Sequence, residues 1–99
     1  MANLRTKLRV HPGEILREEY LVPLGKSARA LASEIGVPAN RLTEIIAARR
    51  GITADTAIRL GRYFGTSAEF WLNMQTTHDL VKAHAETDYS KVQKAKRAA

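Results

Sequence analysis

The spacing of apolar residues between Ala28 and Ala47 predicts two short helices joined by a tight turn. Apolar positions recur at intervals of three and four residues, which is the period of a helix with one buried stripe. The first group is Leu31, Ala32 and Ile35, and the second is Leu42, Ile45 and Ile46. Gly36 interrupts the pattern, where glycine can end a helix in a left-handed conformation, and Pro38 follows where a new helix can begin. The pattern is typical of a helix-turn-helix, although an ordinary helical hairpin would show the same spacing.

Proline, glycine and capping residues set the expected limits of the first three helices. Pro12 suits the first position of a helix, which should run to about Leu21 and be ended by Pro23 and Gly25. Ser27 is a typical cap for helix two, residues 28–35. Helix three is expected at about 38–48.

Two more helices complete the predicted all-α fold. Thr53 is expected to cap helix four, residues 54–64, with a core face of Ala57, Leu60, Gly61 and Phe64. Gly61 is unfavourable inside a helix, so close approach of another helix is expected there. Thr66 and Glu69 match the T-x-x-E capping box, which predicts a fifth helix from Ser67 towards His84. That helix carries Phe70, Trp71, Met74, His78 and Val81 on one broad face.

Length and charge then limit the classes of protein that fit. A chain of 99 residues supports one small domain, here residues 11–85, with an arm at 1–10 and a basic, frayed tail at 86–99. The net charge of +6, from 16 basic and 10 acidic residues, favours a polyanionic partner. The chain has no cysteine, no apolar run near the ~20 residues of a membrane span and no signal-peptide pattern, so a cytoplasmic protein without membrane contact is expected.

Residues 28–47 resemble the helix-turn-helix of the lambda-repressor-like (Cro/C1-type, XRE) DNA-binding domains. Three further stretches, HPGEIL at 11–16, ITADTAIRLGRYFGTS at 52–67 and EFWLNMQ at 69–75, resemble the HigA-type antitoxins of toxin–antitoxin operons. The resemblance covers about residues 8–82. It implies a five-helix DNA-binding domain that represses its own operon as a dimer and neutralises an RNA-cleaving, HigB-type toxin.

The chain departs from this family's pattern at three places. Ala28 stands where many relatives have a glutamine that braces the recognition helix, and His78 stands where a tyrosine is common. Ala47 and Ala48 replace a common Asn-Gly, which removes a helix stop, so helix three could extend towards Arg49. These differences affect the expected operator sequence rather than the fold.

The outward face of helix three supplies the candidate DNA contacts. Asn40 could pair with adenine, Glu44 could accept from cytosine, Thr43 could bond a base or a phosphate, and Ala39 could touch a thymine methyl group. The expected phosphate contacts are basic residues at the edges of this face: Arg29, Arg41, Arg49 and Arg50.

Helix five has more apolar surface than one buried face needs, which predicts a dimer interface that includes Phe70, Trp71, Leu72 and Met74. One recognition helix reads only a few base pairs, and domains of this kind usually bind paired half-sites ~34 Å apart. Burial of the same aromatic residues in the core of one chain is the competing explanation.

No pattern in the sequence indicates catalysis, a cofactor or a metal site. His11, His78 and His84 lack the spacing of metal ligands, and no glycine-rich phosphate loop occurs. Two binding alternatives stay open. One is a solitary helix-turn-helix regulator without a toxin, and the other is a toxin-binding module that has lost DNA binding.

Overall fold

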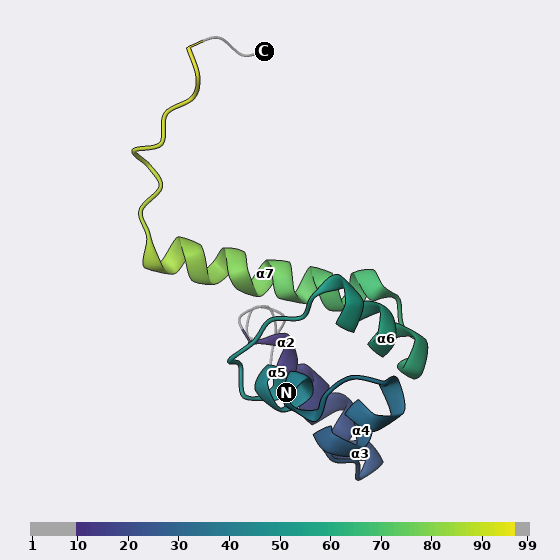
Figure 1. Ribbon diagram of the computed structural model, residues 1–99. Coiled ribbons are helices and arrows are strands. Elements are labelled where there is room, and N and C mark those ends of the chain that lie inside the picture. Colours follow the sequence, from purple (N-terminus) through teal and green to yellow (C-terminus); the bar gives the residue numbers. More distant parts are fainter. Residues whose placement is uncertain (1–9, 97–99) are drawn as a thin grey trace.

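The computed structural model describes residues 10–96, and every regular element in that range is helical. Five helices follow one another along the chain (Figure 1), as the sequence pattern predicts. The first is a continuous helix of three segments, α2 (Pro12–Ile15), η1 (Leu16–Leu21) and α3 (Val22–Leu24). The others are α4 (Ala28–Ile35), α5 (Ala39–Ile46), α6 (Ala54–Phe64) and α7 (Ala68–Glu86).

The first helix runs further than expected, because Pro23 lies inside it. The segment η1 is π-helical, and the Val22 amide at its end bonds to the Arg17 carbonyl five residues back. A wider turn moves the carbonyl that would otherwise clash with the proline ring, so the helix continues to Leu24. Gly25, in the left-handed conformation with φ of 61°, then ends it.

Four helices share one way of ending, in which a left-handed residue turns the chain and two amides bond back to helix carbonyls. Gly25, Gly36 and Gly65 serve three of them, and Ala48 serves α5 with φ of 61°. The Ala48 amide donates to the Ile45 carbonyl at 3.0 Å, and the Arg49 amide donates to the Glu44 carbonyl at 2.8 Å. Helix three therefore ends at Ile46, and the expected extension towards Arg49 is wrong.

The helix starts confirm one predicted cap and correct two. The Ser27 hydroxyl accepts from the Ala30 amide at 3.1 Å, as expected. Thr53 occupies the cap position of α6 but makes no capping bond with its side chain. The predicted T-x-x-E capping box is also wrong, because Ser67 caps α7 and accepts from the Phe70 amide at 3.0 Å. The hydroxyl of Thr66 is used elsewhere, since it accepts from the indole nitrogen of Trp71 at 2.8 Å.

The core is formed by apolar faces of all five helices, and it includes Trp71 of α7, which is fully buried. The helix-four face is confirmed, with Ala57, Leu60 and Gly61 buried and Phe64 packed against the core. A Cβ atom on Gly61 would lie 2.8 Å from the Thr66 carbonyl oxygen. The close approach expected at this glycine is therefore real, and its neighbour is the backbone that leads into α7.

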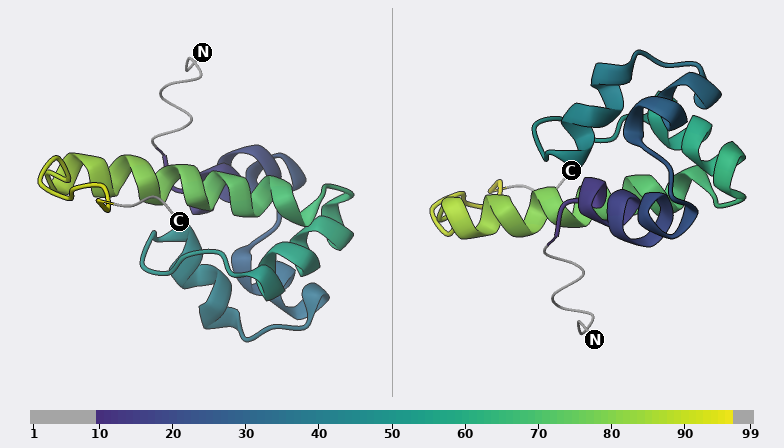
Figure 2. Two further views of the ribbon diagram at one scale, coloured as in Figure 1. Left: turned by 90° about the horizontal axis from the view of Figure 1, so that it is seen from above. Right: turned by 90° about the horizontal axis from the view of Figure 1, so that it is seen from below.

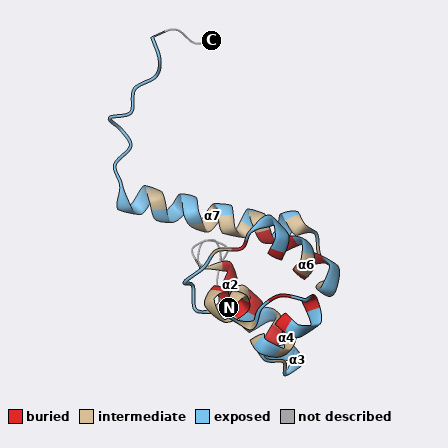
Figure 3. Ribbon diagram, in the orientation of Figure 1, coloured by how far each residue is buried: buried red, intermediate tan, exposed pale blue. Residues whose placement is uncertain are grey.

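The outer half of α7 extends past the other helices in both views of Figure 2. Exposed residues dominate this outer half (Figure 3), and the chain from residue 87 to 96 is exposed and non-helical. The expected arm at 1–10 lies outside the described residues except for Val10, as do residues 97–99 of the expected tail. None of the helices in the described range is long and apolar enough to cross a bilayer.

Candidate nucleic-acid interface

The orientation of α5 is fixed by burial of its apolar face. Leu42 and Ile45 are completely buried, and Ala32 of α4 is 1% exposed where α4 and α5 pack together. A small residue at such a crossing lets the two helices approach closely. The polar side of α5 is left facing away from the core, and α4 and α5 stand to one side of α7 (Figure 2).

A second contact fixes the far end of α5 against the start of α2. A Cβ atom on Gly13 would lie only 1.9 Å from the Ile45 carbonyl oxygen, so no residue larger than glycine fits without moving a backbone. The Gly13 amide donates to Nδ1 of His11 at 2.9 Å, which caps α2 at this junction. The HPGEIL stretch thus holds the C-terminal end of the recognition helix.

The predicted base-contacting residues differ in how freely they face solvent. Asn40 is exposed, whereas Ala39, Thr43 and Glu44 are half-buried. The Thr43 hydroxyl donates to the Asn40 carbonyl at 3.4 Å within the helix. Oε1 of Glu44 lies 2.8 Å from a guanidinium nitrogen of Arg50, so this carboxylate is already paired.

The predicted phosphate-contacting arginines fall into two groups. Arg29 and Arg49 are exposed, at the start of α4 and in the turn after α5. Arg41 and Arg50 are each paired with a carboxylate. Nη1 of Arg41 lies 2.6 Å from Oδ2 of Asp55, and Arg50 is paired with Glu44. Surface ion pairs of this kind contribute little to stability, so DNA phosphates could replace either carboxylate.

Asp55 and Arg59 of α6 form a network around the helix-turn-helix that the sequence analysis missed. Oδ2 of Asp55 accepts from Nη1 of Arg41 and, at 3.1 Å, from Nε of Arg59. Nη1 of Arg59 donates to the carbonyls of Ile35 at 2.8 Å and Gly36 at 3.4 Å. The hydrogen bond from Arg41, and then that from Arg59, holds the pKa of Asp55 below its ordinary value. This network joins α5 and α6 to the turn of the helix-turn-helix.

The only sequence signal for this network was the i, i+4 spacing of Asp55 and Arg59, which is also typical of an ordinary surface pair. The contact from Arg59 to the turn spans 23 and 24 residues and has no local signature.

The loop between α5 and α6 is fastened to α7. Oε1 of Gln75 accepts from the Ile52 amide at 2.8 Å, and Nε2 of Gln75 donates to Asp79 at 2.9 Å. His11 contacts His78 of α7 edge-on, with ring centroids 5.0 Å apart. Burial, reinforced by the charge of His78, lowers the pKa of His11 below its ordinary value. The Gln75 contact therefore fixes the loop that carries Arg49 and Arg50 relative to α7, and the His11 contact fixes the start of α2.

The predicted dimer residues divide between the core and the surface. Trp71 is fully buried and bonded to Thr66, so its side chain has no surface to offer a second copy, and its assignment to a dimer interface is wrong. Phe70 packs edge-on against Trp71 and remains 38% exposed. Leu72 and Met74 are half-buried and pack against the core. Beyond them, Leu80 and Val81 are 55% and 37% exposed on the outer half of α7.

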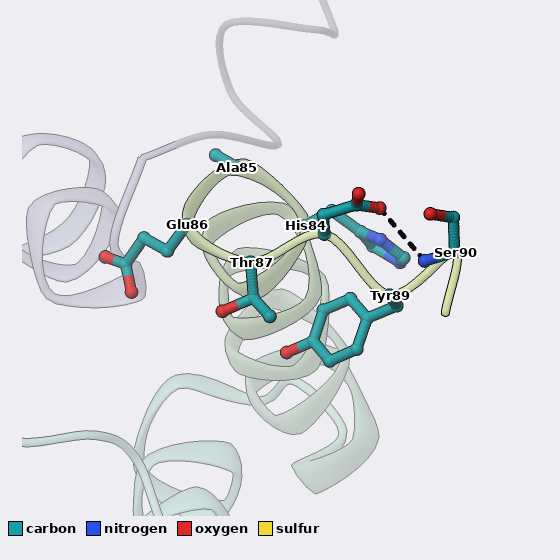
Figure 4. A pocket seen from close by; sticks show the side chains of 7 residues that line it. His84, Ala85, Glu86, Thr87, Tyr89 and Ser90 are labelled. Carbon is teal, nitrogen blue, oxygen red and sulfur yellow. Dashed lines mark hydrogen bonds between the residues drawn. The ribbon is translucent and has the colours of Figure 1, made fainter. Parts of the chain in front are cut away.

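A hollow at the end of α7 has no features of a ligand site. It is lined only by consecutive residues from His84 to Ser90, and the view in Figure 4 shows them following one turn of the chain. The polar contact drawn there is internal to the turn, with the Asp88 carboxylate accepting from the Ser90 amide at 2.9 Å. No group of three or more metal-ligating side chains occurs between residues 10 and 96.

Comparisons with known proteins agree with this geometry. Residues 16–71 match the family model described as helix-turn-helix. The chain is 60% identical over 77 residues to virulence-associated protein I of Dichelobacter nodosus, covering 78% of this chain and 71% of the relative. It is 42% identical over 78 residues to antitoxin HigA-1 of Vibrio cholerae, covering 77% and 72%.

A solved structure extends the comparison to a DNA complex. The structure of Pseudomonas aeruginosa antitoxin HigA with the higBA promoter superposes with a TM-score of 0.77 and 51% identity, covering 78% of this chain and 84% of that one. The departures at Ala28, Ala47 and Ala48 leave the fold intact. The chain therefore belongs to the lambda-repressor-like (XRE-type) helix-turn-helix family, among its HigA-type antitoxins.

Proposed function

We propose that this chain binds operator DNA as a homodimer, represses its own operon and neutralises a HigB-type, RNA-cleaving toxin. The observation that carries the DNA part is the outward polar face of α5, which starts with the exposed Asn40 and is flanked by arginines. Such a face at the N-terminal end of a helix fits the major groove. A similar chain, the P. aeruginosa antitoxin HigA, was solved with its promoter.

In the proposed complex Asn40 and Thr43 read base edges, with Ala39 against a thymine methyl group. Arg29, Arg41, Arg49 and Arg50 neutralise phosphates and so position the helix without reading sequence. Glu44 reaches a cytosine only if Arg50 leaves it for a phosphate, since the two are paired in the free protein.

The dimer is proposed to form along α7. Phe70, Met74, Thr77 and Val81 follow one another at intervals of four, three and four residues, which places them on one side of the helix. Phe70 and Val81 are exposed at the two ends of this stripe, and a second copy packed on them would cover both. A dimer of this kind would present two copies of α5 to successive half-sites.

The test is co-expression with the neighbouring reading frame, followed by size-exclusion chromatography and recovery of DNA from the region upstream of the chain's own gene. We expect a complex with a small basic protein and enrichment of the upstream duplex. DNA recovery without a partner protein would instead favour the solitary regulator. A partner protein without DNA binding would favour the module that has lost DNA recognition.

A further inference from the structure

The carboxylate of Asp55 lies beside an arginine that the DNA backbone is expected to need. Nη1 of Arg41 is 2.6 Å from Oδ2 of Asp55, whereas Arg41 itself belongs to the first turns of the recognition helix. The Arg41 side chain is 29% exposed and the Asp55 side chain 55% exposed. Both groups are therefore within reach of a polyanion that docks on the outward face of α5.

Asp55 is held in this position from its other side. Nε of Arg59 donates to the same oxygen, Oδ2, at 3.1 Å. Arg59 is in turn anchored by its Nη1 to the carbonyls of Ile35 and Gly36 in the turn of the helix-turn-helix. The carboxylate is thus a fixed charge at the edge of the recognition helix rather than a freely rotating surface group.

A fixed carboxylate at this place opposes DNA binding in three ways. It occupies the guanidinium nitrogen of Arg41 that a phosphate oxygen would otherwise accept from, and it repels the incoming phosphate. It also lies in the first turn of α6, where an acid cancels the positive end of the helix dipole that would attract a phosphate.

We propose that Asp55 competes with DNA phosphates for Arg41 and so lowers the affinity of the protein for DNA of any sequence. The inference rests on the proposed function in that it takes α5 as the DNA-binding helix. Because phosphate contacts carry no sequence information, Asp55 limits the sequence-independent part of binding and leaves base reading to other residues.

The test compares Asp55→Asn with wild type by gel-shift titration at several salt concentrations. The probes are the duplex upstream of the chain's own gene and a scrambled duplex of equal length and composition. Asp55→Asn is expected to bind both duplexes about two- to fivefold more tightly, the effect of releasing one surface ion pair. The slope of log affinity against log salt should steepen by up to about 0.9, the contribution of one phosphate contact.

Glu69→Gln is the matched control, because Glu69 is also an exposed acid in the first turn of a helix and the change removes the same charge. It lies in the first turn of the next helix, α7, whereas Asp55 lies in the first turn of α6, and it should change the affinity for either duplex much less. Arg41→Gln, alone and combined with Asp55→Asn, tests the route: the gain from Asp55→Asn should be smaller when Arg41 is gone, because only phosphate repulsion and the effect on the helix dipole remain. Thermal melts of each variant establish that the fold persists.

Unchanged or weaker binding of the folded Asp55→Asn protein to the scrambled duplex overturns the inference. The same gain from Glu69→Gln, or an undiminished gain without Arg41, also overturns it, because the effect would then be one of net charge. Wild-type protein that binds the scrambled duplex but does not prefer the upstream one contradicts operator recognition alone. Wild-type protein that binds neither duplex contradicts both proposals.

Discussion

The recognition helix α5 and the outer half of α7 sort their side chains in different ways. In α5 the apolar residues Leu42 and Ile45 are fully buried, and the face turned to solvent is polar. On the outer half of α7 the apolar Leu80 and Val81 are exposed, and the ring contacts made there join His78 to His11 and His84 to Tyr89.

The difference indicates two kinds of partner surface. A polar, arginine-flanked face is stable in water and complements a nucleic acid, whereas exposed apolar residues are costly in water unless another protein covers them. The single protomer therefore buries the apolar face of its helix-turn-helix but leaves apolar residues of α7 exposed. Trp71 on the inner half of α7 belongs to the protomer core, and we expect the exposed stripe from Phe70 to Val81 to belong to the dimer.

The largest expected effect is loss of the core at the inner half of α7. Trp71→Ala removes a fully buried indole and its bond to Thr66, and should lower the free energy of unfolding by about 3–5 kcal/mol. Chemical denaturation of the variant measures this loss. A loss below about 1 kcal/mol would contradict the assignment of Trp71 to the protomer core.

A charge on the outer half should separate dimerisation from folding. Val81→Glu is expected to convert the dimer to a monomer at micromolar concentration, because dimer formation would bury the added carboxylate, while the far-ultraviolet circular dichroism stays unchanged. Thr76→Glu is the control, since it adds the same charge to α7 away from the proposed stripe. Analytical ultracentrifugation that finds Val81→Glu still dimeric would exclude this stripe from the interface.

A substitution at the end of α5 should change the free energy of unfolding by a smaller amount and in the opposite direction. Ala48 is the only non-glycine residue with positive φ in the described chain, and it makes the same bonds as the glycines that end the other helices. Ala48→Gly should raise the free energy of unfolding by about 1 kcal/mol by removing the steric cost of a left-handed alanine. An unchanged or lower value in denaturant titrations would show that this turn is not strained.

The smallest expected effect is on pH dependence at the junction of α2 and α7. Burial lowers the pKa of His11 in the folded protein, so the unfolded chain binds more protons. Stability should therefore fall as pH drops from about 7.5 through the ordinary histidine value of 6.5. The charged and titratable groups near His11 are His78, Asp79 and Lys82 of α7, and Arg49 and Arg50 of the loop after α5 line the same hollow.

His11→Asn keeps a capping acceptor for the Gly13 amide but cannot titrate. Its melting temperature should fall less than that of wild type between pH 7.5 and 5.5. Parallel curves for the two proteins would rule out a contribution from His11.

The spacing of apolar residues and the positions of proline, glycine and capping residues predicted the five helices and the buried faces. These features depend on local spacing and on which residues are apolar. The same patterns did not predict that Pro23 lies within a helix that continues from a π-helical stretch or that Ala48 ends α5, since both depend on backbone hydrogen bonds formed in the folded chain. Thr66 was predicted as a cap and instead bonds Trp71, a choice that depends on where the indole is buried.

The candidate site was predicted as a set of residues but not as a set of partners. The sequence placed Arg41 and Arg50 on the DNA side, yet it gave no sign that Asp55 and Glu44 pair with them. Such pairs join separate elements, and many arrangements of surface charges are compatible with one helical pattern. For the same reason, the sequence did not predict the contact of Arg59 with the turn of the helix-turn-helix.

The central claim is that the outward face of α5 reads DNA sequence, and Asn40 tests it most directly. Asn40→Ala should weaken binding to the upstream duplex by about 1–3 kcal/mol and relax the preference at one base position, while binding to a scrambled duplex stays the same. Asn73→Ala, which removes an exposed asparagine from α7, is the matched control and should bind as wild type does. Equal affinity of Asn40→Ala and wild type for the upstream duplex would contradict the claim.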